Sequence, residues 1–182
     1  MSAAAQSPTP PKQESSVKQD VGMVTHDYYN DFSHIIGDTL ESYGSTIEFQ
    51  CKVVPQGATQ STIQEIKGQK NAYSWQATLF QTDDFKEAVE AYHKLFHQLN
   101  GADYPIFTKE KWRFSGDYDT PDESRAFASS ILEPVAPTPQ LKQLKIEIAL
   151  NYTMPEWTVK LLVYEKQSDA DIRPTYSDQG TY

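Results

Sequence analysis

Cysteine is almost absent from this chain, which has Cys51 alone among its 182 residues. A single cysteine excludes an internal disulfide, so disulfides cannot stabilise the fold. This is typical of a reducing compartment, although many periplasmic domains also lack disulfides. Cys51 shares an alternating apolar pattern with Phe49 and Val53, which favours a buried thiol over a nucleophile.

Positive charge is also scarce. Lys and Arg number 16 against 25 Asp and Glu, and the formal net charge is −9. Such a chain repels nucleic acid unless it carries a local basic patch. The most basic stretch, Lys109–Arg113, includes a glutamate and is typical of the solvated face of a strand. We therefore expect no nucleic-acid partner. No apolar run is long enough to cross a bilayer, so we expect no membrane span.

Signatures of catalysis are missing as well. The eight glycines are scattered, so no phosphate-binding loop is present, and no G-x-S-x-G motif occurs. His26 and His34 have no partner that the sequence identifies for general base catalysis. The sequence therefore predicts no cofactor and gives catalysis no positive support.

Large apolar residues are also rare near both ends of the chain. The residues at positions 1–22 and 168–182 are predicted to be a disordered leader and a flexible polar tail, because they cannot bury enough surface to offset ordering. Residues 23–167 then form a single domain. The small residues Ala3–Ala5 admit two interpretations. They belong to an ordinary cytoplasmic leader, or they are the remnant of a signal cleavage site, which makes the protein periplasmic or otherwise extracytoplasmic.

The clearest structural pattern lies between Tyr73 and Gly101. Apolar and polar residues alternate over Tyr73–Phe80, which predicts a strand. Thr82–Asp84 offer acceptors for a helix start, and Asn100-Gly101 ends the helix. One stripe of this predicted helix is apolar: Phe85, Ala88, Val89, Tyr92, Phe96 and Leu99. The helix therefore needs a sheet beneath it.

The remaining segments suggest one more helix and several strands. Asp27 is a plausible N-cap for a helix over Tyr28–Ile36, where apolar residues recur at helical spacing. Alternation predicts strands over Thr46–Val54, around Trp112 and Phe114, and in a hairpin over 144–152 and 157–164; Ser61–Ile66 is a candidate short strand. For residues 121–132 two alternatives stay open. The capping box Thr120–Glu123 indicates a short helix, and the alternation of Phe127, Ser129 and Ile131 indicates a strand.

Consecutive strands with few helices predict an α+β fold, namely a mainly antiparallel sheet of about five strands with two helices packed on one face. Aromatic residues are plentiful on the predicted inward faces. Four of them are candidates for lining a groove that binds a ligand: Tyr73, Trp75, Trp112 and Trp157. The alternative is an aromatic core. The wet strand faces, including Leu162 and Tyr164, are a further candidate partner surface.

The sharpest chemical feature is the pair His93 and His97. At i,i+4 spacing both rings lean to one side of the predicted helix, where they can share a divalent metal, and Glu90 lies one turn earlier. A zinc site needs further ligands, and the sequence nominates none. The competing interpretation is a solvated helix face.

The leading functional hypothesis is therefore a non-enzymatic binding or protein-interaction module for a protein or a small ligand. A small metal-assisted hydrolase using the histidine pair, and a structural accessory domain of a larger assembly, are the alternatives.

Overall fold

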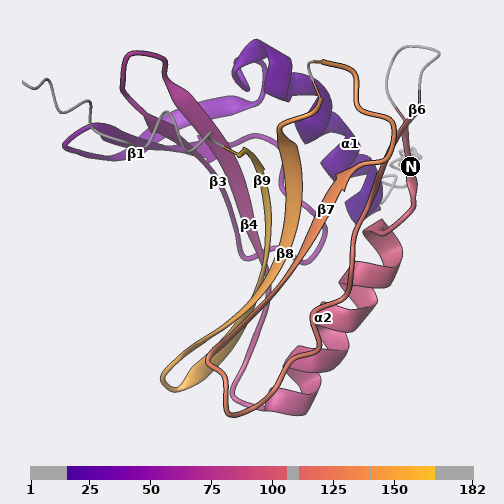
Figure 1. Cartoon of the computed structure of the whole chain (residues 1–182). Helices are drawn as coiled ribbons and strands as arrows, with labels where there is room; N and C mark the ends of the chain where they lie inside the picture. Colours follow the sequence, from indigo (N-terminus) through magenta and orange to yellow (C-terminus); the bar gives the residue numbers. More distant parts are fainter. Residues whose placement is uncertain (1–15, 106–110, 140, 167–182) are drawn as a thin grey trace, which may run out of the picture.

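The computed structural model describes residues 16–105, 111–139 and 141–166, which form one antiparallel sheet of nine strands and two α-helices (Figure 1). The prediction of an α+β fold with about five strands is therefore wrong, because the fold is mainly β. The elements in chain order are α1 (Val17–Asp27), the 3-10 helix η1 (Tyr28–Asn30), β1 (Ile36–Tyr43), β2 (Thr46–Cys51), β3 (Gln60–Ile66), β4 (Ala72–Thr82), α2 (Phe85–Leu99), β5 (Asp103–Pro105), β6 (Lys111–Ser115), β7 (Phe127–Pro134), β8 (Leu144–Thr153) and β9 (Glu156–Glu165).

The sheet joins two halves of the chain. Its strand order is β1-β2-β3-β4-β9-β8-β7-β6-β5. Each half begins with a helix, continues with antiparallel strands, and ends on a strand at the centre of the sheet. The junction is the antiparallel pairing of β4 with β9, in which Thr78 lies opposite Lys160. The two halves therefore share one sheet rather than forming separate domains.

Helix α2 forms where the sequence predicts it. The Asp84 side chain accepts hydrogen bonds from the backbone N–H groups of Lys86 and Glu87, at 2.7 and 3.3 Å, and so satisfies donors that the first turn leaves free. The helix buries one apolar face against the sheet: Ala88, Tyr92, Leu95, Phe96 and Leu99. Each large side chain on that face contributes roughly 1.5–3 kcal/mol of burial free energy, so packing outweighs the cap.

The other helix lies elsewhere than predicted. Residues 28–36 do not form the predicted α-helix. The short 3-10 helix η1 is followed by left-handed backbone at Asp31 and Phe32, with φ of 52° and 56°. Helix α1 precedes this turn instead, and its residues 17–22 are ones that the sequence assigned to the leader. The helical spacing of the apolar residues Phe32 and Ile35 arises because both point into the core from a turn.

Asp27 holds this turn in place. Its carboxylate accepts hydrogen bonds from the backbone N–H groups of His34 and Ile35, at 3.0 and 3.2 Å, from the amide of Asn30, and from the His34 ring. Asp27, which the sequence predicted to be the N-cap of a following helix, is instead the last residue of α1. Its side chain holds the loop that follows α1 in place. The Asp27 side chain is 6% exposed, so these donors replace water.

Three further elements differ from the sequence predictions. Strand β1 occupies residues that were expected to follow a helix, and the short β5 was not predicted. Of the two alternatives for residues 121–132, the strand is correct, because β7 spans Phe127–Pro134. The expected capping box does not begin a helix. Asp122 instead accepts hydrogen bonds from the backbone and hydroxyl of Ser124, which makes a turn.

The core lies between the sheet and the two helices. One row of side chains that are fully buried crosses five neighbouring strands, β3, β4, β9, β8 and β7: Ile63, Trp75, Val163, Ile146 and Leu132. The predicted strands over 46–54, 61–66 and 73–80 and the hairpin of β8 and β9 are confirmed. In Figure 1, both helices lie on one side of the sheet.

Candidate functional site

Two of the four aromatic groove candidates lie in β4 and face the core side. Trp75 is fully buried, and its indole N–H donates to the Ser61 hydroxyl at 3.0 Å. Tyr73 is half-buried and donates its hydroxyl to the Glu65 carboxylate at 3.1 Å. Both side chains are thus occupied by contacts within the fold.

The other two candidates lie far apart along the sheet. Trp112, on β6, packs edge-to-face against Tyr29, with ring centroids 5.6 Å apart. Trp157, on β9, lies between Phe85 and Tyr152, at 4.9 and 4.8 Å. Within the described residues, no ring contact joins any two of the four candidates. A ligand role for them stays a prediction, and no shared groove supports it.

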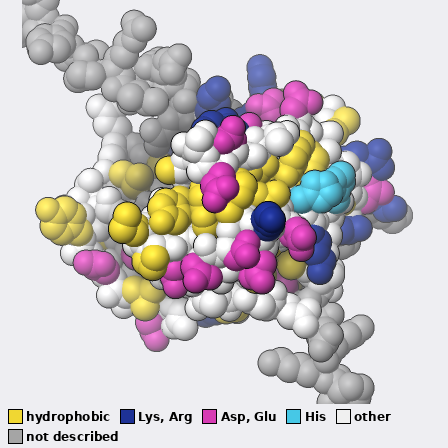
Figure 2. All heavy atoms as spheres, turned by 90° about the horizontal axis from the view of Figure 1, so that it is seen from below, with side chains coloured by type: hydrophobic (Ala, Val, Ile, Leu, Met, Phe, Trp, Pro, Cys, Tyr) yellow, Lys and Arg dark blue, Asp and Glu magenta, His cyan; other side chains and the backbone are white. Residues whose placement is uncertain are grey.

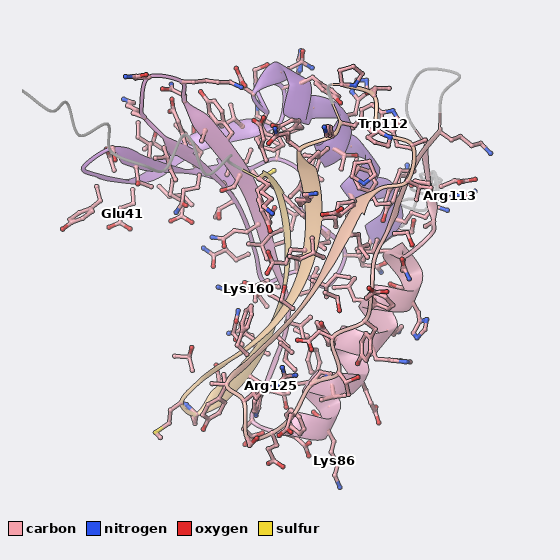
Figure 3. The ribbon with its side chains drawn as sticks, in the orientation of Figure 1. Glu41, Lys86, Trp112, Arg113, Arg125 and Lys160 are labelled. Atoms are coloured by element: carbon pink, nitrogen blue, oxygen red, sulfur yellow. The ribbon has the colours of Figure 1, made fainter. Side chains whose placement is uncertain are left out.

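No other described element covers the sheet face opposite the helices, and we call it the open face. Its central row lies next to the buried row and crosses the same five strands: Thr62, Gln76, Leu162, Glu147 and Ile131. Within this row Thr62 is buried by its neighbours, Ile131 is exposed, and the other three side chains are half-buried. Tyr164 and Lys160 lie beside Leu162 along β9. Figure 3 shows the labelled Glu41 and Lys160 on the side of the sheet away from α2. The wet strand faces predicted around Leu162 and Tyr164 therefore belong to one continuous surface.

Glu147 organises the middle of the open face. Its two carboxylate oxygens accept hydrogen bonds from Ser129 at 2.6 Å and from Tyr164 at 2.8 Å. Burial, together with this hydrogen bond to Glu147, raises the pKa of the Tyr164 hydroxyl above its ordinary value of 10. These hydrogen bonds hold Glu147, Ser129 and Tyr164 in fixed positions as a half-buried polar centre, and Glu147 forms no ion pair within the described residues.

Two acidic side chains, Glu41 and Glu48, help to line a hollow at the β1–β2–β3 end of the open face. The hollow has a volume of ≈ 260 Å³ and is lined by Glu41, Tyr43, Thr46, Glu48 and Gln64. Glu41 and Glu48 are directly opposed across β1 and β2. Neither carboxylate forms an ion pair within the described residues. Like charges in such a pair repel each other, so the hollow favours cationic groups.

The sequence did not identify this hollow, because β1 was not recognised as a strand. The signal that was available is Gly44. With φ of 58° it begins a two-residue turn, Gly44-Ser45, which joins β1 to β2. A glycine with such freedom between two polar, alternating segments is typical of a hairpin.

The structure does bring His93 and His97 together. Their Nε2 atoms lie 2.8 Å apart on the exposed side of α2. Histidine side chains lie at the end of an apolar stripe in Figure 2, which views the molecule from below. Glu90 is exposed one turn earlier. In residues 16–105, 111–139 and 141–166, no group of three or more His, Cys, Asp or Glu side chains is placed to hold a metal ion. The two histidine rings therefore lie together, but within the described residues no third His, Cys, Asp or Glu side chain is placed to complete a metal site with them.

No family model, curated protein or solved structure matches this chain. None of the helices in the described ranges has the length and apolar character needed to cross a membrane.

Proposed function

We propose that this protein is a non-enzymatic interaction module that binds a protein partner across the open face. The partner's basic side chains enter the hollow beside Glu41 and Glu48. The observation that carries the proposal is the uneven cover of the sheet: both helices pack on one face, and no described element covers the other.

Support comes first from the composition of the open face. Hydrophobic side chains are exposed on β7, where Phe127 is 52% and Ile131 is 42% exposed. They lie beside the fixed polar centre at Glu147. Apolar contacts combined with positioned polar groups are typical of protein-binding surfaces rather than of solvated sheet faces.

Electrostatics favour a basic partner. Glu41 and Glu48 are opposed at the rim of the hollow, and a lysine or arginine placed between them offsets their repulsion. The formal net charge of −9 attracts a basic partner from a distance as well.

Photo-crosslinking in the cells that produce the protein tests this proposal. A photoreactive amino acid replaces Gln64 or Gln76 on the open face, and in the matched control it replaces Lys86, which is exposed on α2. We expect a discrete protein adduct from the two open-face positions and none from position 86.

Charge reversal then tests the hollow. We expect Glu41→Lys combined with Glu48→Lys to abolish the adduct, because it replaces two unpaired carboxylates with cations. Glu87→Lys, an exposed change on α2, serves as the charge control and should leave the adduct intact. Equal crosslinking from both faces, or an adduct insensitive to the double reversal, would refute binding through the open face.

A further inference from the structure

We propose that His93 and His97 form a surface site for a divalent metal that accepts imidazole ligands at right angles, namely Cu²⁺ or Ni²⁺. This site lies on α2, on the covered side of the sheet, and is independent of the open face. The two Nε2 atoms lie 2.8 Å apart.

The separation matches a particular coordination geometry. Metal–imidazole bonds are about 2.0–2.1 Å long, so two nitrogens bound at 90° lie about 2.8–3.0 Å apart, and two bound at the tetrahedral angle lie about 3.3–3.4 Å apart. The pair in α2 corresponds to the right-angled arrangement. Square-planar or tetragonal nitrogen sites are typical of Cu²⁺ and Ni²⁺, whereas Zn²⁺ prefers the tetrahedral one.

Neighbouring aromatic rings hold both imidazoles in place. Tyr118 packs edge-to-face against His93, with ring centroids 5.5 Å apart, and Phe96 packs in the same manner against His97 at 5.6 Å. Phe96 and Tyr118 also contact each other. The rings are therefore positioned before a metal arrives, which reduces the entropy lost on binding.

Metal binding requires the proton that lies between the two imidazole rings to move. In the free protein the short contact needs one ring to donate its Nε2–H to the bare Nε2 of the other. When a metal binds, the donating ring moves its proton to Nδ1, so both Nε2 lone pairs face the ion. No net proton is released, and water completes the coordination. His97 also lies in the last turn of α2, where the helix dipole favours a cation.

Titration of the full chain with Cu²⁺ tests the site, using protein without a polyhistidine tag that has been stripped with a chelator. We expect one equivalent to bind, with an electron paramagnetic resonance spectrum showing nitrogen ligands. His93→Gln or His97→Gln should each weaken binding by at least about tenfold, because the second ligand is lost from a chelate. Zn²⁺ should bind more weakly than Cu²⁺ or Ni²⁺.

A register control separates chelation from the mere presence of histidine. His97→Gln combined with Gln98→His keeps two histidines on α2 but places them about 140° apart around the helix. Both positions are exposed, so folding should be unchanged, as circular dichroism can verify. We expect this variant to bind as weakly as the single variants. Equal copper affinity in the wild type and the register control, or no copper retained by the wild type, would overturn the proposal.

Discussion

Each half of the chain begins with an α-helix that is followed by antiparallel strands, but the two halves stabilise their helices differently. In the second half, α2 places a continuous apolar face on the sheet and is capped by Asp84. In the first half, α1 is shorter, and Asp20, Thr25 and Asp27 are buried along with its valines. One helix is held mainly by apolar burial, and the other combines burial with internal hydrogen bonds.

Buried polar groups follow the same division across the rest of the fold. Among the residues that the structure describes, eight polar or charged ones are buried, and six of these belong to the first half: Asp20, Thr25, Asp27, Ser61, Thr62 and Glu65. Such groups need partners, because an unpaired buried donor or acceptor costs more free energy than its hydrogen bond gains. Each half therefore supports a helix on the shared sheet with a different balance of apolar burial and internal hydrogen bonds.

The largest effect is expected from Phe96→Asp in α2. Phe96 is 4% exposed, so this change removes a packed ring and buries a carboxylate without a partner. We expect more than about 4 kcal/mol lost from the free energy of unfolding, which is enough to prevent folding. Urea denaturation followed by circular dichroism measures it. Lys94→Glu, exposed on the same helix, should change stability by less than about 0.5 kcal/mol. A folded Phe96→Asp variant would show that α2 does not depend on its apolar face.

Asp27→Ala should have the next largest effect. It leaves the backbone N–H groups of His34 and Ile35 without their acceptor. We expect a loss of about 2–4 kcal/mol, since more than one buried donor loses its partner. Ser33→Ala, at an exposed position in the same loop, is the control for general loop damage. If both variants lose the same stability in urea titrations, the carboxylate of Asp27 is not the anchor.

The ionisation of Asp27 should also make the free energy of unfolding depend on pH. Burial by itself raises the pKa of this carboxyl, but hydrogen bonds from His34 and Asn30 outweigh burial, and the pKa lies below its ordinary value of 3.8. A lowered pKa means that ionised Asp27 stabilises the fold above the unfolded pKa, and that this contribution is lost as the pH falls through the folded pKa. The wild type should therefore lose more stability than Asp27→Asn between about pH 5 and pH 3. Parallel curves for the two proteins in urea titrations would contradict the assignment.

Tyr92→Phe examines a hydrogen bond in the second half. The Tyr92 hydroxyl lies 2.6 Å from the Ser130 hydroxyl, and both residues are buried. The Ser130 hydroxyl also accepts from the backbone N–H of Asp119. We expect a loss of about 1–2 kcal/mol, smaller than that of Asp27→Ala because Ser130 keeps one partner. Thermal denaturation gives the ordering of the two variants, and the reverse ordering would break the contrast between the halves.

The two helix caps should give the smallest effects. Asp84 accepts two backbone hydrogen bonds, whereas Ser16 accepts one, from Gln19 at 3.3 Å. We expect Asp84→Ala to cost about 1 kcal/mol and Ser16→Ala about 0.5 kcal/mol. Asp83→Ala, exposed beside the cap, is the control. Denaturation midpoints that reverse the two losses would show that α1 depends on its cap more than α2 does.

The contrast between the halves also explains what the sequence could predict. Helix α2, strand β4 and the β8–β9 hairpin follow from local periodicity, because their side chains face one core. Helix α1 carries a weaker apolar signal, and Gly22 interrupts it. The fold of residues 28–36 depends on Asp27 reaching donors up to eight positions away, which no local spacing reveals.

The candidate sites were predictable to different degrees. Histidines four residues apart on a helix meet whatever the rest of the fold does, so His93 and His97 were identified correctly as neighbours. The hollow at Glu41 and Glu48 depends on which strands pair. Likewise, the order of strands separates Trp112 from Trp75 and Trp157, and the register of β4 against β9 separates Trp75 from Trp157. Sequence patterns gave the face of each strand but not its neighbours.

The pairing of β4 with β9 has a consequence for how the protein is made. Strand β4 lies near the centre of the finished sheet, and one of its two partners, β9, is the last strand of the described chain. While the ribosome is still synthesising the intervening strands, β4 is an unprotected edge that displays Trp75 and Leu79. Nascent chains therefore face their greatest risk of aggregation before β9 emerges, and chaperone protection matters most during that interval.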